Sequence, residues 1–286
     1  MSRPEPSRLN RGDVLGVSVS SVTMADAVAR IAGWIDEGRR AYICVTGVHG
    51  VMECRRDDAL RAIHARADMV APDGMPLVWF LRLSGDRRIQ RVYGPDLMRA
   101  FTAMSVPRGY RHFYYGGAPG VANRLAETLR RAHPGLQVAG TLCPPFRPPT
   151  PDEDRAEIAA INAARPDIVW IGLSTPKQER WMHTHLDRID ASVMIGVGAA
   201  FDFLAGTKSQ APPWFGRNGL EWLFRLCTEP RRLWRRYAYI VPGFLFLAAR
   251  EFALRAIFQS ARHRSNGRAK PEGKANERPP GRQDPG

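Results

Sequence analysis

The chain has 286 residues, of which 44% are hydrophobic. This is enough to bury a sizeable core, which excludes a wholly disordered chain and a disulfide scaffold. The formal net charge is +14, and the segment from Arg225 to Gly286 holds 14 Lys and Arg against five Asp and Glu. Such an excess suits an anionic partner, whether phospholipid, nucleic acid or nucleotide phosphate.

Targeting and redox features point to a cytoplasmic protein. The N-terminus has no apolar run that would make a signal peptide. No stretch reaches the roughly 18 apolar residues that span a bilayer. The four cysteines show no metal-binding spacing, so we expect reduced thiols.

Along the chain, residues 1–12 read as a flexible leader, and residues 13–206 alternate short apolar runs with amphipathic helical patterns. This alternation predicts βα units and a mostly parallel sheet with helices on both faces. The predicted strands are Ala41–Val45, Asp68–Ala71, His112–Tyr115, Gln137–Thr141, Asp167–Gly172 and Ser192–Val197. The predicted helices are Met52–Arg66, Met75–Leu83, Pro119–Ala132, Asp152–Ala164 and Pro176–Ile189.

The pattern changes near residue 207. Lys208–Asn218 reads as a loop, and Gly219–Tyr237 places aromatic residues and arginines at helical spacing. Tyr239–Phe258 then predicts an amphipathic helix broken at Pro242-Gly243. We therefore expect a helical appendage over 207–258, followed by a disordered basic tail over 259–286.

One carboxylate follows a predicted strand and precedes a predicted helix. Asp73 lies at the carboxyl-end edge of the predicted sheet, where open α/β sheets bind ligands. A carboxylate there suits a general base for a sugar hydroxyl, a contact to a ribose, or a metal ligand. The structural alternative is that Asp73 only caps the helix that begins near Met75.

Three glycine-bearing loops also follow predicted strands, and glycines let backbone N–H groups approach a phosphate. The loops are Tyr114–Gly120, Gly172–Glu179 and Gly196–Asp202. Their candidate binding residues are Gly116, Gly117, Lys177, Gln178, Glu179, Gly198 and Asp202. Plain tight turns and helix capping, with Pro176 at a first helical position, are the alternatives.

His49 follows the first predicted strand and is a candidate site residue. The appendage carries clustered arginines. Guanidinium groups pair bidentately with diphosphate. The same stretch also suits an amphipathic helix on anionic lipid, and the two interpretations are compatible. No aspartate pair or His/Asp spacing predicts a metal site, and no cofactor is expected. The clustered arginines are Arg225, Arg231, Arg232, Arg235 and Arg236.

Seven segments together carry a resemblance to a known family. They are Ala67–Gly74, Arg91–Leu97, Tyr115–Gly117, Pro176–Glu179, Gly196–Asp202 and Gly219–Arg225 with Glu229–Arg232. In this order they resemble the bacterial WecG/TagA/CpsF glycosyltransferases, over residues 40 to 240. Those enzymes transfer a sugar from a nucleotide donor to a polyprenyl-diphosphate-linked acceptor.

The resemblance implies a Rossmann-like core, an appendage that folds over the site at the membrane, and metal-independent inversion at the anomeric carbon. The family's proposed general base falls on Asp73, its site glutamine on Gln178, and its appendage arginines in the Arg225–Arg236 cluster. The expected function is transfer from a UDP-sugar, such as UDP-N-acetylmannosamine, in exopolysaccharide or cell-wall polymer synthesis. The expected location is peripheral, on the inner face of the cell membrane.

The chain departs from the family pattern at two places. The segment Val45-Thr-Gly-Val-His49 lacks the family's asparagine, so Thr46 or His49 is expected to take over its contacts. Gln210-Ala-Pro212 stands where an arginine is frequent in the family.

Two other functions are alternatives to a glycosyltransferase. A nucleotide-binding protein without transferase chemistry is one. A nucleic-acid-binding protein built on the tail is another, disfavoured because the basic residues near the core mix with Trp and Leu. The transferred sugar and the oligomeric state, homo-oligomer included, stay open.

Overall fold

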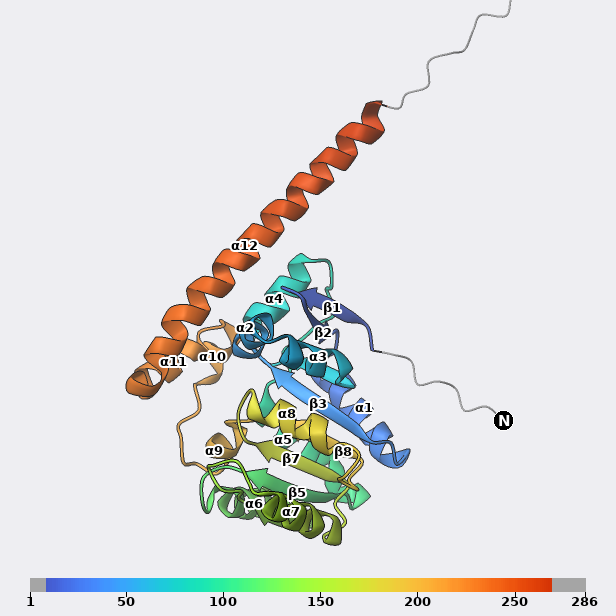
Figure 1. The fold of residues 1–286 in the computed structure, drawn as a ribbon, viewed down its shortest axis with the longest axis vertical. Helices are drawn as coiled ribbons and strands as arrows, with labels where there is room; N and C mark the ends of the chain where they lie inside the picture. Colours follow the sequence, from blue (N-terminus) through green and yellow to red (C-terminus); the bar gives the residue numbers. More distant parts are fainter. Residues whose placement is uncertain (1–8, 269–286) are drawn as a thin grey trace, which may run out of the picture. The chain divides into compact units, whose positions relative to one another are not determined.

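The computed structural model describes residues 9–268 and contains, in that range, a six-stranded sheet in which all neighbouring strands are parallel (Figure 1). The strand order is β4-β3-β8-β7-β5-β6. This confirms the predicted α/β fold class. The strands are β3 (Ala41–Thr46), β4 (Met69–Pro72), β5 (Arg111–Gly116), β6 (Gln137–Leu142), β7 (Ile168–Gly172) and β8 (Val193–Gly196).

Helices cover both faces of the sheet (Figure 1). One face carries α1 (Met24–Asp36), α5 (Gly94–Ser105), α6 (Val121–Ala132) and α9 (Ala200–Leu204). The other carries α2 (Val48–Arg56), α3 (Asp58–Arg66), α7 (Pro151–Ala163) and α8 (Lys177–His185). Because apolar side chains of both helical layers are buried, burial of apolar surface is the main force that holds the sheet and the helices together.

The N-terminal part contains elements that the sequence pattern did not predict. β1 (Arg11–Val14) and β2 (Val17–Ser20) form an antiparallel hairpin whose turn residues, Leu15 and Gly16, both have positive φ. β1 begins inside the stretch predicted as a leader, while residues 1–8 lie outside the described range. The helices α1 and α5 were also not predicted. Thr23 and Asp26 form a capping box at the start of α1.

Two predicted helical boundaries were wrong. The single helix expected over Met52–Arg66 is two helices, because the Asp57 side chain accepts a hydrogen bond from the Leu60 N–H and caps a new helix. The loop expected over 208–218 contains the short helix α10 (Pro213–Arg217). Two further elements are the single turn η1 (Val106–Arg108) and the helix α4 (Met75–Leu83), which packs against β1 and β4.

The C-terminal part consists of α11 (Glu221–Thr228) and α12 (Pro230–Arg268). α12 continues through Pro242, so the break predicted there is wrong. The chain divides into two compact units, residues 1–245 and 246–286. In the first unit, α12 buries Leu233, Ile240 and Phe244. The predicted tail, 259–286, is helical to Arg268, and its remainder lies outside the described residues. No helix within residues 9–268 is both long and apolar enough to cross a membrane.

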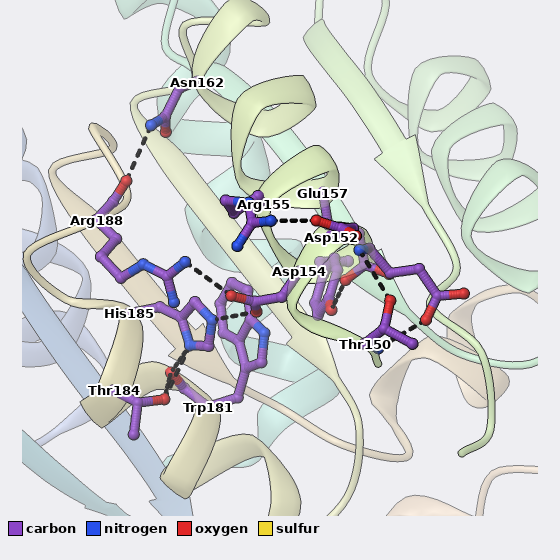
Figure 2. A network of polar contacts seen from close by, with 12 residues as sticks. Thr150, Asp152, Asp154, Arg155, Glu157, Asn162, Trp181, Thr184, His185 and Arg188 are labelled. Carbon is purple, nitrogen blue, oxygen red and sulfur yellow. Dashed lines mark hydrogen bonds and ion pairs between the residues drawn. The ribbon is translucent and has the colours of Figure 1, made fainter. Parts of the chain in front are cut away.

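A polar and aromatic network holds α7 against α8 (Figure 2). The His185 Nε2 atom lies 2.8 Å from Asp154 Oδ1, and Arg188 pairs with the other carboxylate oxygen at 2.7 Å. Trp181 stacks between Tyr115 and His185, with ring centroids 4.5 and 4.4 Å away. Burial raises the pKa of Asp154, but hydrogen bonds from His185 and Arg188 outweigh it and hold the pKa below its ordinary value. The network fixes α8, whose first turn reaches the cavity described next.

Candidate functional site

A cavity of about 190 Å³ lies where β3, β4, β7 and β8 end. In the sheet, β3 lies between β4 and β8, and the loops after β3 and β8 diverge, because the first leads into α2 on one face and the second into α9 on the other. Open α/β sheets bind ligands at such a switch point. The polar side chains that line the cavity are those of His49, Asp73, Tyr93, Ser174, Thr175, Gln178, Asp202, Lys208, Glu221, Arg225, Arg232, Arg236 and Tyr237.

Asp73 is held at the end of β4 with one carboxylate oxygen engaged. Its N–H donates to the Thr46 carbonyl at 2.9 Å, and the Gly94 N–H donates to Oδ1 at 3.0 Å. Among residues 9–268, no hydrogen bond reaches Oδ2, which lies on the side of Gly47. Burial raises the pKa of Asp73 to about 6, against the opposing effect of Arg91, while Glu221 adds to the rise. The carboxylate is therefore a stronger base than an exposed aspartate and has an oxygen available.

Arg91 and Glu221 form an ion pair beside this carboxyl group. Arg91 Nε donates to the Asp73 carbonyl at 2.5 Å, and its guanidinium pairs with the Glu221 carboxylate. The guanidinium also lies 4.0 Å from the centre of the Tyr93 ring. Both residues lie in segments that resemble the family, but they were not among the predicted site residues. Their place in these segments was the one sequence feature that could have indicated them, because the two residues are far apart in the chain.

Gln178 lines the cavity with a side chain whose amide oxygen is buried and unpaired within residues 9–268. Its side chain is only 2% exposed, and Nε2 donates to Glu179 Oε1 at 3.0 Å, an oxygen that also accepts from Thr175 Oγ1 at 2.8 Å. This fixes the amide orientation. Gln178 Oε1 then has no hydrogen-bond partner among the described residues and lies beside Gly198. A Cβ at Gly196 would lie 3.0 Å from the amide carbon, so glycine there lets the amide cross the strand end.

Four cations line the rest of the cavity, and all follow residue 207: Lys208, Arg225, Arg232 and Arg236. Arg232 and Arg236 are four residues apart, so they share one face of α12. Arg231 and Arg235, from the same predicted cluster, do not line the cavity. Lys208 Nζ lies 3.2 Å from Asp202 Oδ2 and 3.5 Å from Glu229 Oε2. The cations outnumber the lining carboxylates and suit a diphosphate.

His49 lines the cavity as a neutral side chain at neutral pH. Burial lowers its pKa to about 4, with further lowering by the nearby Arg236, Arg225 and Arg56. Because its pKa lies below that of Asp73, the imidazole is the weaker base of the two. Its nitrogens remain able to hydrogen-bond a bound molecule.

The other predicted residues lie away from the cavity. Thr46 is buried, with Oγ1 3.2 Å from His64 Nε2. The carboxyl group of Glu179 accepts a hydrogen bond from the Gln178 amide, and neither Glu179 nor Lys177 lines the cavity. A Cβ on Gly116 would lie 2.8 Å from the Gly172 backbone and one on Gly117 3.1 Å from Val121, so these glycines allow close packing of β5 on its neighbours. Within residues 9–268, no three His, Cys, Asp or Glu side chains gather as a metal site would require.

Comparison with known proteins identifies a family and several relatives. Residues 12–257 match the glycosyl transferase WecG/TagA/CpsF family. An N-acetylglucosaminyldiphosphoundecaprenol N-acetyl-beta-D-mannosaminyltransferase of Bacillus spizizenii is 31% identical over 204 residues, which cover 71% of this chain and 77% of the relative. The protein of the same name from Bacillus subtilis is 27% identical, with 76% and 82% covered. That of Staphylococcus aureus is 24% identical, with 87% and 96% covered.

Proposed function

The chain belongs to the WecG/TagA/CpsF glycosyltransferase family, and we propose that it transfers N-acetylmannosamine from a UDP donor to a polyprenyl-diphosphate-linked N-acetylglucosamine. The sugar and the acceptor follow the names of the relatives. The observation that carries the proposal is that the base Asp73 and the cations Arg225, Arg232 and Arg236 line the same cavity. Such transfer needs both: a base for the hydroxyl and positive charge for the leaving diphosphate.

The proposed reaction is a single displacement. Asp73 Oδ2 removes the proton of the acceptor hydroxyl while the hydroxyl oxygen of the acceptor forms a bond to the anomeric carbon of the donor. The bond from that carbon to the β-phosphate oxygen breaks on the opposite side, and its electron pair leaves with UDP. Because the nucleophile enters opposite the leaving group, the anomeric configuration inverts. The raised pKa of Asp73 assists proton removal near neutral pH.

The leaving diphosphate is neutralised by side chains in this proposal. Arg225, Arg232 and Arg236 supply fixed positive charge where the negative charge develops, with Lys208 beside them. Arginine pairs bidentately with phosphate oxygens, which also orients the donor. We therefore propose that turnover is independent of a divalent cation.

A donor panel tests the function. The purified chain is incubated with a short-chain N-acetylglucosaminyl-diphospholipid and each of several UDP-sugars, with and without excess EDTA. UDP-N-acetylmannosamine should yield a disaccharide lipid, at rates within about twofold in the two conditions. Loss of activity in EDTA that manganese or magnesium restores would contradict metal independence. UDP binding without a product from any donor would favour a nucleotide-binding protein without transferase chemistry.

We also propose that the appendage contacts an anionic membrane surface. Its segment up to residue 245 exposes large apolar side chains, Trp214, Leu223, Trp234 and Tyr239, among arginines. Trp234 is 53% exposed and lies under the Arg235 guanidinium. Aromatic and basic residues together suit the interface between lipid headgroups and acyl chains. A lipid-linked acceptor would be presented to the cavity from that surface.

Trp234→Ala should weaken binding to anionic vesicles by about tenfold, because a large apolar side chain contributes roughly 1.5–3 kcal/mol when fully buried. Co-sedimentation with phosphatidylglycerol vesicles measures the change, and added salt should weaken the wild type. Phe146→Ala is the matched control, since Phe146 is 81% exposed and lies before α7. Equal binding by Trp234→Ala and the wild type would remove this part of the proposal.

A further inference from the structure

Arg91 joins two parts of the chain that the proposed reaction needs together. Its Nε donates to the carbonyl of Asp73, and its guanidinium pairs with Glu221 at the start of α11. The two side chains are 17% and 19% exposed, so the pair is largely withdrawn from solvent. A largely buried pair adds little net stability, but removing one partner leaves the other charge uncompensated and costs much more. The contact is therefore sensitive to the loss of either charge.

The segment before α11 is shaped for close approach to this arginine. A Cβ on Gly216, in α10, would lie 2.6 Å from Arg91 Nη1. A Cβ on Gly219 would lie 2.7 Å from the Trp79 ring of α4, and Gly219 has a φ of +67°. Two glycines thus let residues 213–221 lie against α4 and the guanidinium, a fit that any side chain at either position would disturb.

Three groups surround Arg91: the Asp73 turn, the Tyr93 ring and the Glu221 carboxylate. Of these three groups, Glu221 alone comes from the appendage, and Gly216 approaches the guanidinium without a side chain. Four residues after it, on the same helix, Arg225 lines the cavity. The position of α11 therefore determines both where Arg225 lies and how much of the Arg91 charge is neutralised beside Asp73.

We propose that Glu221 is a positioning residue, which through its ion pair with Arg91 fastens α11 to the Asp73 turn and so aligns base and leaving-group cations in one cavity. This inference rests on the proposed function. Glu221 also lines the cavity, but the proposed reaction assigns it no proton transfer. Its role is to make proton removal depend on a seated appendage.

The neutral variant Glu221→Gln separates this role from a merely structural one. With the carboxylate gone, Arg91 acts on Asp73 without its counter-charge, so the pKa of Asp73 falls. Because Glu221 raises the pKa of Asp73, its replacement by glutamine should move the acid limb of kcat/KM to lower pH. A weaker base and a displaced α11 should lower kcat by roughly 10- to 100-fold.

The experiment compares the wild type, Glu221→Gln, Glu221→Asp and the control Asp190→Asn, which removes the carboxylate of an exposed pair with Arg40. The pH dependence of transfer and amide hydrogen exchange over residues 213–228 are both measured. Glu221→Gln should show faster exchange there, unchanged protection in the sheet, lower kcat and the shifted acid limb. Glu221→Asp should keep the acid limb of the wild type because its charge is retained. The control should match the wild type.

Exchange over 213–228 that is the same in Glu221→Gln and the wild type would overturn the inference, and this readout needs no turnover. An unshifted acid limb in Glu221→Gln would overturn it as well. In both cases an active wild type leaves the proposed function intact. A wild type without transferase activity contradicts the proposed function instead, while exchange still decides whether Glu221 fastens α11.

Discussion

Asp73→Asn is expected to lower kcat by about two to four orders of magnitude, the usual contribution of a general base. Asparagine keeps the shape of the side chain and its acceptor for the Gly94 N–H, but it removes the oxygen that takes the proton. UDP binding should change little, because the substitution leaves the cavity cations Arg225, Arg232 and Arg236 in place. The loss should therefore appear in kcat, with donor affinity close to that of the wild type.

Asp202→Asn is the matched control for this substitution. Asp202 lines the same cavity, but its carboxylate is engaged by Lys208 at 3.2 Å and by Thr207 Oγ1 at 3.0 Å. An engaged carboxylate is a poorer base, so kcat should fall by less than about tenfold. Steady-state transfer and calorimetric UDP binding measure both variants. Turnover of Asp73→Asn within a few-fold of the wild type would show that another group removes the proton.

Arg232→Ala/Arg236→Ala is expected to lower kcat/KM for transfer by about 10²- to 10³-fold. Both guanidinium groups line the cavity, and fixed charge aimed at a developing anion stabilises the transition state. Arg231→Ala/Arg235→Ala removes the same number of charges from the same helix, at positions outside the cavity. With a water-soluble acceptor analogue, this second pair should cost less than about tenfold.

The comparison separates charge at the site from charge on the surface. Initial rates of the two double variants are measured at one ionic strength, without vesicles, so that membrane binding does not contribute. A large loss confined to the first pair supports a diphosphate site at Arg232 and Arg236. Equal losses in the two pairs would mean that the net charge of α12, rather than its cavity face, affects the rate.

Much of the fold could be predicted because short apolar strands alternate with amphipathic helices. Topology also explains why two of the three glycine-bearing loops, Gly172–Glu179 and Gly196–Asp202, line one cavity, since parallel strands place their carboxyl ends at one edge. The third, Tyr114–Gly120, does not line it. Asp73, Gln178 and Gly198 do lie around one cavity. Two sequence neighbours of cavity-lining residues do not enter the cavity. Thr46 precedes a cavity-lining glycine and Glu179 follows Gln178, yet both side chains are buried against other partners. Register within a turn decides which side chain enters a cavity, and spacing alone does not determine it.

Other features depend on contacts that no local pattern encodes. The pair Arg91–Glu221 joins residues 130 positions apart, so only tertiary packing brings them together. Pro242 lacks a backbone N–H and predicts a helix break, but packing of Ile240 and Phe244 accompanies a continuous α12. The hairpin turn at Leu15-Gly16 was overlooked because leucine rarely adopts positive φ.

The central claim is that the Asp73 carboxylate removes the acceptor proton, and the pH dependence of kcat/KM tests it most directly. The base must be ionised, so activity should be full above its pKa and fall as the pH decreases through it. With the pKa of Asp73 raised to about 6, the wild type should lose activity with a midpoint near pH 6. The residual activity of Asp73→Asn should lack this limb. A kcat/KM for the wild type that is constant from about pH 5 to 8 would contradict the claim.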